Sequence, residues 1–276
     1  MSAVRRTAET VAPGVVRVIA PNPSPMTGPG TNSYVVGTGP CAIIDPGVND
    51  DDHLDALIAA APGEIVAILV THAHPDHTGG ARRLAERLGV PVHAHGTPLQ
   101  GVRDKEFYAD RPMADGDRLV LGELTLQALH TPGHAADHLC FFWPEAGLLF
   151  AGDTVMADVT VVILPPDGGM TAYLESLTRL RELPIKQIAP GHGRLLDNAL
   201  VVLAQIVEHR LAREAQVREA LSESDSATTS DEIAGTLYPD LDPRLRGMAA
   251  AQVESHLVRL AELGAARADG AYWMPD

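Results

Sequence analysis

The chain has 276 residues, of which 45% are hydrophobic and 21% charged, an ordinary composition for a globular protein. This length accommodates one large domain, or a core of about 200 residues with a small appendage. The formal net charge of −15 argues against a nucleic-acid partner, because an acidic surface repels polyanions. The two cysteines, Cys41 and Cys140, lie beside apolar runs and are expected to be buried free thiols in a reducing, cytoplasmic setting.

The N-terminal segment does not predict export. Arg5 and Arg6 are not followed by the apolar run of about 7–15 residues that a secretory signal requires. No window approaches the ~18 uninterrupted apolar residues of a transmembrane helix. We therefore expect a cytoplasmic protein without a membrane span.

The first ~195 residues are expected to form short apolar strands broken by Gly and Pro turns. Helical stretches at 78–88 and 171–183 carry apolar residues at intervals of three and four, which predicts sheets covered by helices. The predicted strands are 15–20, 33–36, 41–44, 65–70, 90–94, 119–128, 139–143, 148–151 and 185–189.

The pattern changes after Asp197. A long helix is predicted over 198–221, a polar linker follows, and a second helix begins near Ser230. A third helix over 248–263 is stopped by Gly264, and Asp269-Gly270 predicts the turn of a short hairpin over 265–274. Three helices and a hairpin are typical of a winged helix, so we predict two domains, 1–197 and 198–276.

A winged helix often binds DNA, but the charge of this one argues otherwise. Residues 197–276 contain 7 Arg, no Lys and 14 Asp or Glu, a formal net charge of −7. We therefore favour a packing or substrate-lid role for the C-terminal domain. A nucleic-acid-binding regulator with a vestigial metal site remains the non-enzyme alternative.

Histidine and aspartate residues follow several of the predicted strands. The segment 71–77 reads Thr-His-Ala-His-Pro-Asp-His, and three further groups appear in TPGH, FAGD and PGHG. Ligands that follow neighbouring strands can converge on one edge of a sheet. The metal-ligand candidates in these groups are His72, His74, Asp76, His77, His134, Asp153 and His192.

Neutral imidazole and carboxylate suit Zn²⁺ and similar metals, and Mn²⁺ or Fe would also accept several of these donors. A structural zinc site needs only four ligands and is usually rich in Cys. Seven N and O candidates without a Cys favour a catalytic centre with two Zn²⁺ ions, in which a carboxylate such as Asp153 can bridge. Two such metals can share a hydroxide and make it a nucleophile at neutral pH.

The remaining histidines carry weaker signals. His53, His209 and His256 are expected to be exposed helix residues, and His93 and His95 to be strand residues. His130 and His138 flank the TPGH turn. A role in supporting the ligands or contacting substrate is therefore open for both, and we carry His138 forward as a candidate.

Together these residues resemble the metallo-β-lactamase superfamily over the first ~195 positions. The resemblance implies an α+β fold, a four-layer αββα sandwich with the metal centre at one edge. It implies that His72, His74 and His134 hold the first metal, and that Asp153 bridges. It further implies that the second metal is held by Asp76, His77 and His192, and that Asp45 in IIDPG supports the ligands from behind.

Within the superfamily, TNSYVVGTGP, TPGHAADH, APGHG and the C-terminal region are similar to the β-lactamase-like protein 2 group. That group includes single-strand endoribonucleases, and related fungal enzymes are polyketide-type thioesterases. The chain departs from the group in its apolar 157–169 segment and in Ala73, where a bulkier aromatic is often found. Secreted β-lactamases usually carry Cys at the position of Asp153, and glyoxalase II has a different C-terminal region, so both are less favoured alternatives.

The sequence therefore predicts a metal-dependent hydrolase of an acyl or phosphoryl substrate, with Asp76 orienting the nucleophile or passing a proton to the leaving group. The apolar 157–169 segment and the acidic charge favour a small-molecule or acyl-carrier substrate over nucleic acid. The family resemblance favours RNA. At this stage the endoribonuclease and the thioesterase both stay open.

Overall fold

Two β-sheets form the centre of the molecule in the computed structural model, which describes residues 8–96, 103–104, 106–157, 159–224 and 226–276. The Arg5 and Arg6 pair lies outside the described residues. The first sheet has seven strands in the order of the sequence: β1 (Ala8–Ala12), β2 (Val15–Ile19), β3 (Asn32–Val36), β4 (Cys41–Ile44), β5 (Ile65–Leu69), β6 (Val92–His95) and β7 (Arg111–Met113). The second sheet has six strands in the order β13 (Leu196–Asp197), β12 (Gln187–Pro190), β11 (Leu148–Gly152), β10 (Leu139–Trp143), β9 (Leu124–His130) and β8 (Arg118–Leu121).

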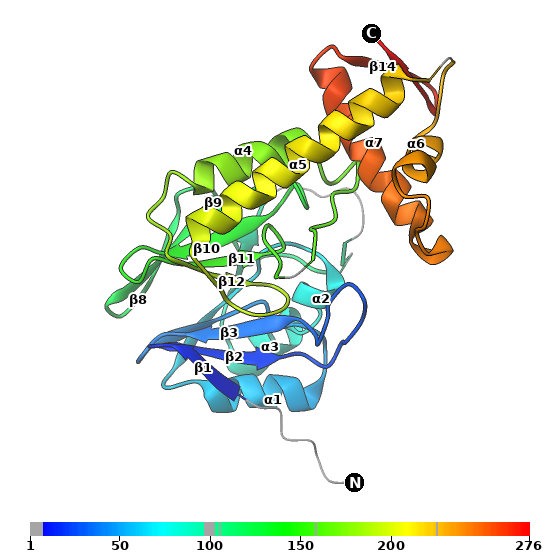
Figure 1. The fold of residues 1–276 in the computed structure, drawn as a ribbon. Helices are drawn as coiled ribbons and strands as arrows, with labels where there is room; N and C mark the ends of the chain where they lie inside the picture. Colours follow the sequence, from blue (N-terminus) through cyan, green and yellow to red (C-terminus); the bar gives the residue numbers. More distant parts are fainter. Residues whose placement is uncertain (1–7, 97–102, 105, 158, 225) are drawn as a thin grey trace.

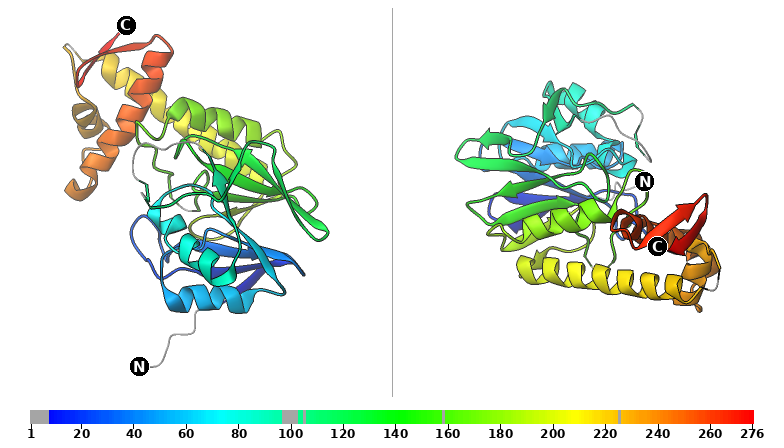
Figure 2. Two further views of the ribbon diagram at one scale, coloured as in Figure 1. Left: turned by 180° about the vertical axis from the view of Figure 1, so that it is seen from behind. Right: turned by 90° about the horizontal axis from the view of Figure 1, so that it is seen from above.

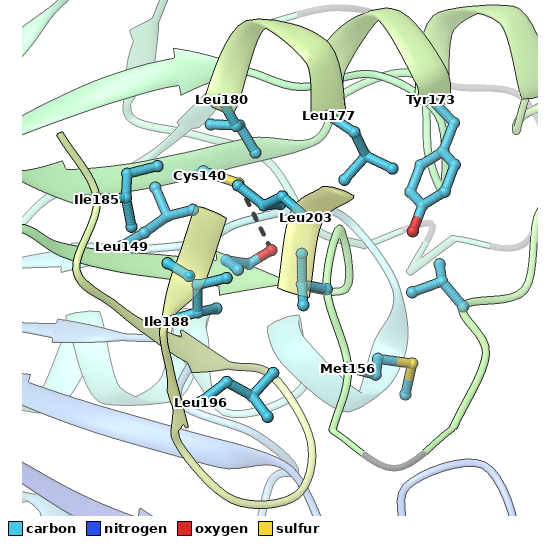
Figure 3. Close-up of a cluster of buried hydrophobic side chains, with 14 of the residues drawn as sticks. Cys140, Leu149, Met156, Tyr173, Leu177, Leu180, Ile185, Ile188, Leu196 and Leu203 are labelled. Carbon is cyan, nitrogen blue, oxygen red and sulfur yellow. Dashed lines mark hydrogen bonds between the residues drawn. The ribbon is translucent and has the colours of Figure 1, made fainter. Parts of the chain in front are cut away.

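Helices cover the outer face of each sheet, as Figures 1 and 2 show. On one side lie α1 (Asp51–Ala60) and α3 (Ala81–Leu88), and on the other α4 (Met170–Leu180) and α5 (Ala199–Ser222). One apolar cluster fills the space between the sheets, and one lies under the helices on each side. Figure 3 shows the cluster under α4 and α5, where Leu177 and Leu203 meet Leu149 and Ile188. The predicted four-layer αββα sandwich is confirmed.

The burial of the strands explains why the sequence pattern predicted them. Every residue of β3, β4 and β11 is buried, because these strands have a sheet on one side and helices on the other. Cys41 and Cys140 are buried free thiols, as predicted. The single strand predicted over 119–128 is wrong, since the left-handed Gly122 (φ 65°) begins a tight turn between β8 and β9.

The C-terminal region forms a separate module with its own core. It comprises the far end of α5, then α6 (Ser230–Leu237), a short 3₁₀ turn η1 (Pro243–Leu245), α7 (Arg246–Glu262) and the hairpin of β14 (Ala266–Asp269) and β15 (Tyr272–Pro275). A capping box of Thr229 and Glu232 starts α6. These elements confirm the predicted winged helix. No helix in the described part of the chain is long and apolar enough to cross a membrane.

Two histidines expected to be exposed are buried instead. His53 is 0% exposed because α1 turns it inward, where its Nε2 lies 3.0 Å from Ser33 Oγ. His256 is 1% exposed because α7 packs against α5. In both helices the histidine lies on the buried face. A hydrophobicity pattern does not detect this, because histidine is a polar residue. His209 is exposed and His93 and His95 lie in β6, as expected.

The two sheets are tied together at one edge of the sandwich. The backbone N–H of Leu139 donates to Thr71 O at 2.7 Å, and that of Asn32 donates to Gly191 O at 2.7 Å. Both bonds join a residue at the end of one sheet to the other sheet. Figure 1 shows α2 (Pro75–Thr78) at this same end, which faces the C-terminal module. The predicted ligand residues follow β5, β9, β11 and β12 here.

Candidate metal centre

The segment after β5 is held in place by Asp45, which follows β4. Its carboxylate accepts the backbone N–H of Thr71 at 2.8 Å and the Thr71 hydroxyl at 2.8 Å. It also accepts His77 Nδ1–H at 2.9 Å. Asp45 is 2% exposed and has a left-handed backbone (φ 51°), a conformation that Asp tolerates better than most residues. One buried carboxylate therefore fixes both ends of the segment 71–77.

A first group of three imidazole nitrogens converges beside this segment. His74 Nδ1 lies 2.9 Å from His72 Nε2 and 3.0 Å from His134 Nε2. Three nitrogens bound tetrahedrally at zinc's usual ~2.0–2.1 Å would lie about 3.3 Å apart. The spacing of the three nitrogens is therefore close to what one metal ion requires.

A second group lies beside the first. His192 Nε2 is 3.3 Å from Asp76 Oδ2, and His77 Nε2 is 3.6 Å from the same oxygen. These three side chains offer ligand atoms within 4.8 Å of one another, as do the three of the first group. The structure thus brings together two sets of donors, each of a size that fits one cation.

Asp153 lies between the two groups and faces both. Its Oδ1 is 3.5 Å from His77 Nε2 and 3.4 Å from His192 Nε2, both in the second group. Its Oδ2 is 3.7 Å from His134 Nε2 in the first. One carboxylate with an oxygen toward each group has the geometry of a bridging ligand.

The outer nitrogens of the histidines show that their inner nitrogens carry lone pairs. His134 Nδ1 lies 2.6 Å from Val162 O, and His192 Nδ1 lies 3.4 Å from Gly30 O, so each must donate a proton outward. His72 Nδ1 lies 3.0 Å from Thr71 Oγ1. Because that hydroxyl donates its proton to Asp45, it can only accept a proton from His72 Nδ1. In the neutral imidazole, a proton on one nitrogen leaves the other as an acceptor. In the neutral form of each ring, the remaining lone pair therefore points into its group.

Two buried atoms at the centre lack a hydrogen-bond partner. They are His77 Nε2 and Asp153 Oδ1, which face each other in the second group. A buried polar atom without a partner costs about 1–3 kcal/mol, so it calls for an explanation. A divalent cation between these atoms would satisfy both, and the N and O donor set suits zinc, manganese or iron. The residues present therefore fit the two-metal centre that the sequence predicts.

The two groups differ in their electrostatics. Burial first, and then the neighbouring histidines, lower the pKa of His72 well below its ordinary value and that of His74 to about 4. Burial also lowers the pKa of His192, but Asp153 and Asp76 outweigh it and raise that pKa to about 9. His72 and His74 are therefore neutral imidazoles, while the carboxylates of the second group attract positive charge. A metal bound in the second group would displace protons.

His138 does not face the metal groups directly. It is fully buried, its Nε2 accepts the backbone N–H of Asp153 at 3.0 Å, and its ring stacks on His72 at 5.0 Å. It therefore positions two of the candidate ligands. His130 lies outside the site, where its ring stacks on His95 at 4.3 Å.

Two glycines that sequence reasoning overlooked make room for this arrangement. A Cβ on Gly191 would lie 2.5 Å from Asp153 Oδ1, and one on Gly152 would lie 2.7 Å from Thr71 Oγ1. Gly152 also has a left-handed backbone (φ 46°). The sequence places both glycines directly beside candidate ligands, in FAGD and PGHG. A side chain at either position would occupy the space that the ligand atoms need.

Two further carboxylates near the site also escaped the sequence analysis. Asp137 is 3% exposed and accepts the backbone N–H of Ala73 at 3.0 Å. Asp167 accepts the N–H of Ala136 at 3.1 Å, and its Oδ2 lies 3.9 Å from His74 Nε2. Burial, with Asp167 nearby, raises the pKa of Asp137 to about 7. An isolated Asp gives no pattern in a sequence, so only folding reveals this pair.

Asp137 makes the stability of the metal-free protein depend on pH. A carboxyl whose pKa is raised on folding favours the folded state when protonated, so its contribution is lost as pH rises from the unfolded pKa toward about 7. We expect the free energy of unfolding of metal-depleted protein, relative to Asp137→Asn, to fall by roughly 2–3 kcal/mol between pH 5 and 8. Urea unfolding of both proteins measures this difference. A difference that does not change with pH would contradict it.

A cavity of about 450 Å³ opens beside the two groups. His74, Asp76, His134, Asp153 and His192 form its polar floor. Its apolar walls come from the loop after β2 and from residues 156–166: Met26, Met156, Val162, Leu164, Pro165 and Pro166. Among the described residues that line it there is no Lys or Arg.

The chain belongs to the metallo-β-lactamase superfamily, whose members are generally hydrolases and bind divalent metals, and residues 26–192 match it. Residues 229–273 match the β-lactamase-associated winged helix domain. The suspected family is thus confirmed for both parts of the chain.

Individual proteins of known sequence or structure are also similar to this chain. The chain is 29% identical to "Beta-lactamase-like protein 2 homolog" of Caenorhabditis elegans over 93% of this chain and 87% of the relative. It is 34% identical to "Atrochrysone carboxyl ACP thioesterase" of Aspergillus chevalieri over 78% of this chain and 68% of the relative. A solved metallo-β-lactamase family protein from Thermus thermophilus superposes with a TM-score of 0.78 at 26% identity, covering 97% of this chain and 100% of that one.

Proposed function

We propose that this protein is a dinuclear metal-dependent hydrolase that cleaves acyl thioesters. The observation that carries the proposal is the cavity of about 450 Å³, which joins the donor groups to apolar walls and has no Lys or Arg among its described lining residues. Burying the apolar surface of an acyl chain against such walls favours binding by roughly 25 cal/mol per Å². A polyanion such as RNA would find no Lys or Arg on these walls to pair with its phosphates.

The seven candidate ligands would hold two metal ions, with His72, His74 and His134 on one, Asp76, His77 and His192 on the other, and Asp153 between them. When bound, the ions lower the pKa of a water between them and polarise the substrate carbonyl. The donor set suits zinc first, and manganese or iron also. Elemental analysis of the purified protein identifies the metal.

Asp76 is the residue assigned to proton transfer. Its side chain is 29% exposed, against 8% for Asp153, and it lines the cavity. The attacking water forms a bond to the acyl carbon, the carbon–sulfur bond breaks, and Asp76 passes the water's proton to the leaving sulfur. The products are a carboxylic acid and a thiol.

The acyl part of the substrate would lie along the 161–166 segment. Val161 and Ile163 are buried in the core under α4 and anchor this segment, while Val162, Leu164 and the two prolines face the cavity. The similarity to a carrier-protein thioesterase supports an acyl group presented on a carrier.

A substrate panel tests the proposal. Metal-loaded protein is assayed on acyl thioesters, a β-lactam, a lactone, a phosphodiester and single-stranded RNA. We expect thioester hydrolysis, and a kcat about 10²–10³-fold lower in Asp76→Ala, the usual cost of losing a positioned proton carrier. Asp240→Ala, an exposed aspartate of the C-terminal module, serves as the matched control and should retain full activity.

Three results would overturn the proposal. If wild type and Asp76→Ala hydrolyse every substrate equally poorly, the protein is not a hydrolase of this class. If RNA is cleaved and thioesters are not, the endoribonuclease is correct. If salt-sensitive DNA binding occurs without hydrolysis, the regulator with a vestigial metal site is correct.

A further inference from the structure

A second cavity, of about 430 Å³, lies between the C-terminal module and the segment that follows β11. Its lining comes from α5, the loop between α6 and η1, η1 itself, α7, and residues Thr160 and Val162. Val162 lines both this cavity and the one beside the metal ligands. We call the second cavity the module groove.

The charge of the module groove differs from that of its surroundings. Residues 197–276 contain 14 Asp or Glu and 7 Arg. The described residues that line the groove nevertheless include two arginines, Arg210 and Arg213, and two histidines, His209 and His256, with no carboxylate. A positive patch within an acidic module is complementary to an anionic ligand.

Arg213 is available for such a ligand. Its guanidinium stacks over the ring of Tyr238 at 4.6 Å, and the structure gives it no carboxylate partner in the part of the chain that it describes. The neighbouring Glu214 pairs instead with Arg259 and faces His256 Nδ1 at 3.6 Å. A guanidinium held flat on an aromatic ring keeps its N–H groups free to bind phosphate oxygens.

His256 places an imidazole in the groove from α7. It is 1% exposed, it lines the groove, and neither ring nitrogen has a hydrogen-bond partner. Its Nδ1 lies 3.6 Å from Glu214, so Nε2 is the nitrogen left over. Burial, with Arg210 and Arg213, lowers the pKa of His256 against the opposite effect of Glu214, so an anion beside Nε2 would favour the protonated ring that can donate to it.

Apolar side chains complete the groove. Leu245 and Met248 remain 44% and 36% exposed, and Tyr238 and Leu241 lie beside them. An occupant therefore needs an anionic group at one end and a less polar stem. A polynucleotide would present a phosphate at every step, which this single cluster of cationic groups does not match.

The groove is connected to the metal ligands through hydrogen bonds. The guanidinium of Arg210, on α5, donates to Val161 O and, at 3.3 Å, to Gln252 Oε1 of α7. The next carbonyl, Val162 O, accepts from His134 Nδ1. Residues 161–162 are thus a common wall, and a substrate could place its reacting end on one side and its remote end on the other.

We propose that the module groove binds the 4′-phosphopantetheine arm of a thioester substrate, with the phosphate at Arg213 and His256 and the arm along Met248. The inference rests on the proposed thioesterase function, since it assigns the thiol half of that substrate. The winged helix then serves to recognise the substrate. The phosphate of the arm would lie at the cationic groups, and its amide-bearing stem along the apolar wall. The terminal thioester would then reach the metal ligands.

Calorimetry with metal-loaded protein tests the site without any turnover. We expect 4′-phosphopantetheine to bind at least tenfold more tightly than pantetheine, because only the former has the phosphate. In Arg213→Met and in Met248→Glu the ratio should fall to about one, whereas Arg218→Met, an exposed arginine on the same helix, should keep it. Equal binding of the two compounds by wild type overturns the proposal. So does an RNA oligonucleotide that binds in an Arg213-dependent manner when phosphopantetheine does not.

Hydrolysis assays on the same samples separate this inference from the proposed function. If phosphopantetheine binds selectively but no thioester is cleaved, the function is wrong and the subsite stands. If short thioesters are cleaved but no selectivity is seen, the subsite is wrong and the function stands. The KM values of Arg213→Met for acyl-coenzyme A and for an acyl carrier protein show which source of the arm is used. We expect the variant to raise KM about tenfold for the substrate that uses the groove.

Discussion

Replacing Asp153 with Asn is expected to lower kcat at least 10³-fold and to reduce the metal content from two ions per chain toward one. The Asp153 carboxylate faces both donor groups, with Oδ1 3.4 Å from His192 Nε2 and Oδ2 3.7 Å from His134 Nε2. An amide keeps the shape but loses the charge and one of the two acceptor oxygens. Elemental analysis and thioester hydrolysis on the same preparation measure both effects.

The control for this substitution is Asp240→Asn, which alters an exposed carboxylate of the C-terminal module. Wild-type metal content and activity are expected for it. If Asp153→Asn keeps two ions per chain and near-wild-type kcat, Asp153 does not bridge. The assignment of this carboxylate would then have to be abandoned.

Replacing Asp45 with Asn is expected to reduce the free energy of unfolding by about 2–4 kcal/mol and to weaken metal binding about 10–100-fold. Asp45 accepts three hydrogen bonds, from the Thr71 N–H, the Thr71 hydroxyl and His77 Nδ1. The amide would turn an N–H group toward these donors. Asn tolerates the left-handed backbone at this position (φ 51°), so the effect isolates the lost acceptor.

Chemical denaturation and metal titration measure the two consequences separately. Asp52→Asn, on the exposed face of α1, is the matched control and should change neither. If Asp45→Asn binds metal like wild type, Asp45 does not position the ligands. Metal binding at His77 would then be independent of its hydrogen bond.

The apolar pattern predicted sheets covered by helices because several strands are buried on both faces, whereas the four-layer sandwich was implied by the family resemblance. Strands such as β3 and β11 appear as unbroken apolar runs, which the pattern detects. The sequence pattern predicted one strand in place of β8 and β9 because the turn between them is only two residues long. It misplaced His53 and His256 because a histidine on the buried face of a helix has no hydrophobic signature.

The candidate site was predictable in part for a related reason. Its proposed ligands follow strands, so His72, His134, Asp153 and His192 could be grouped before their distances were known. The sequence did not show that His72 follows a strand of the first sheet and the other three follow strands of the second. Asp137, Asp167 and the module groove could not be predicted. Each depends on how the 157–169 segment and α5 pack against residues far away in the chain, as Arg210 does on Val161.

The most direct test of the two-metal centre is a titration of metal-depleted protein with Zn²⁺, in which thioester hydrolysis and bound metal are recorded at each step. Both groups of donors, with Asp153 between them, predict that activity rises until two ions are bound per chain and then stays constant. Activity that is already complete with one ion bound, or that persists in fully depleted protein, would contradict the account.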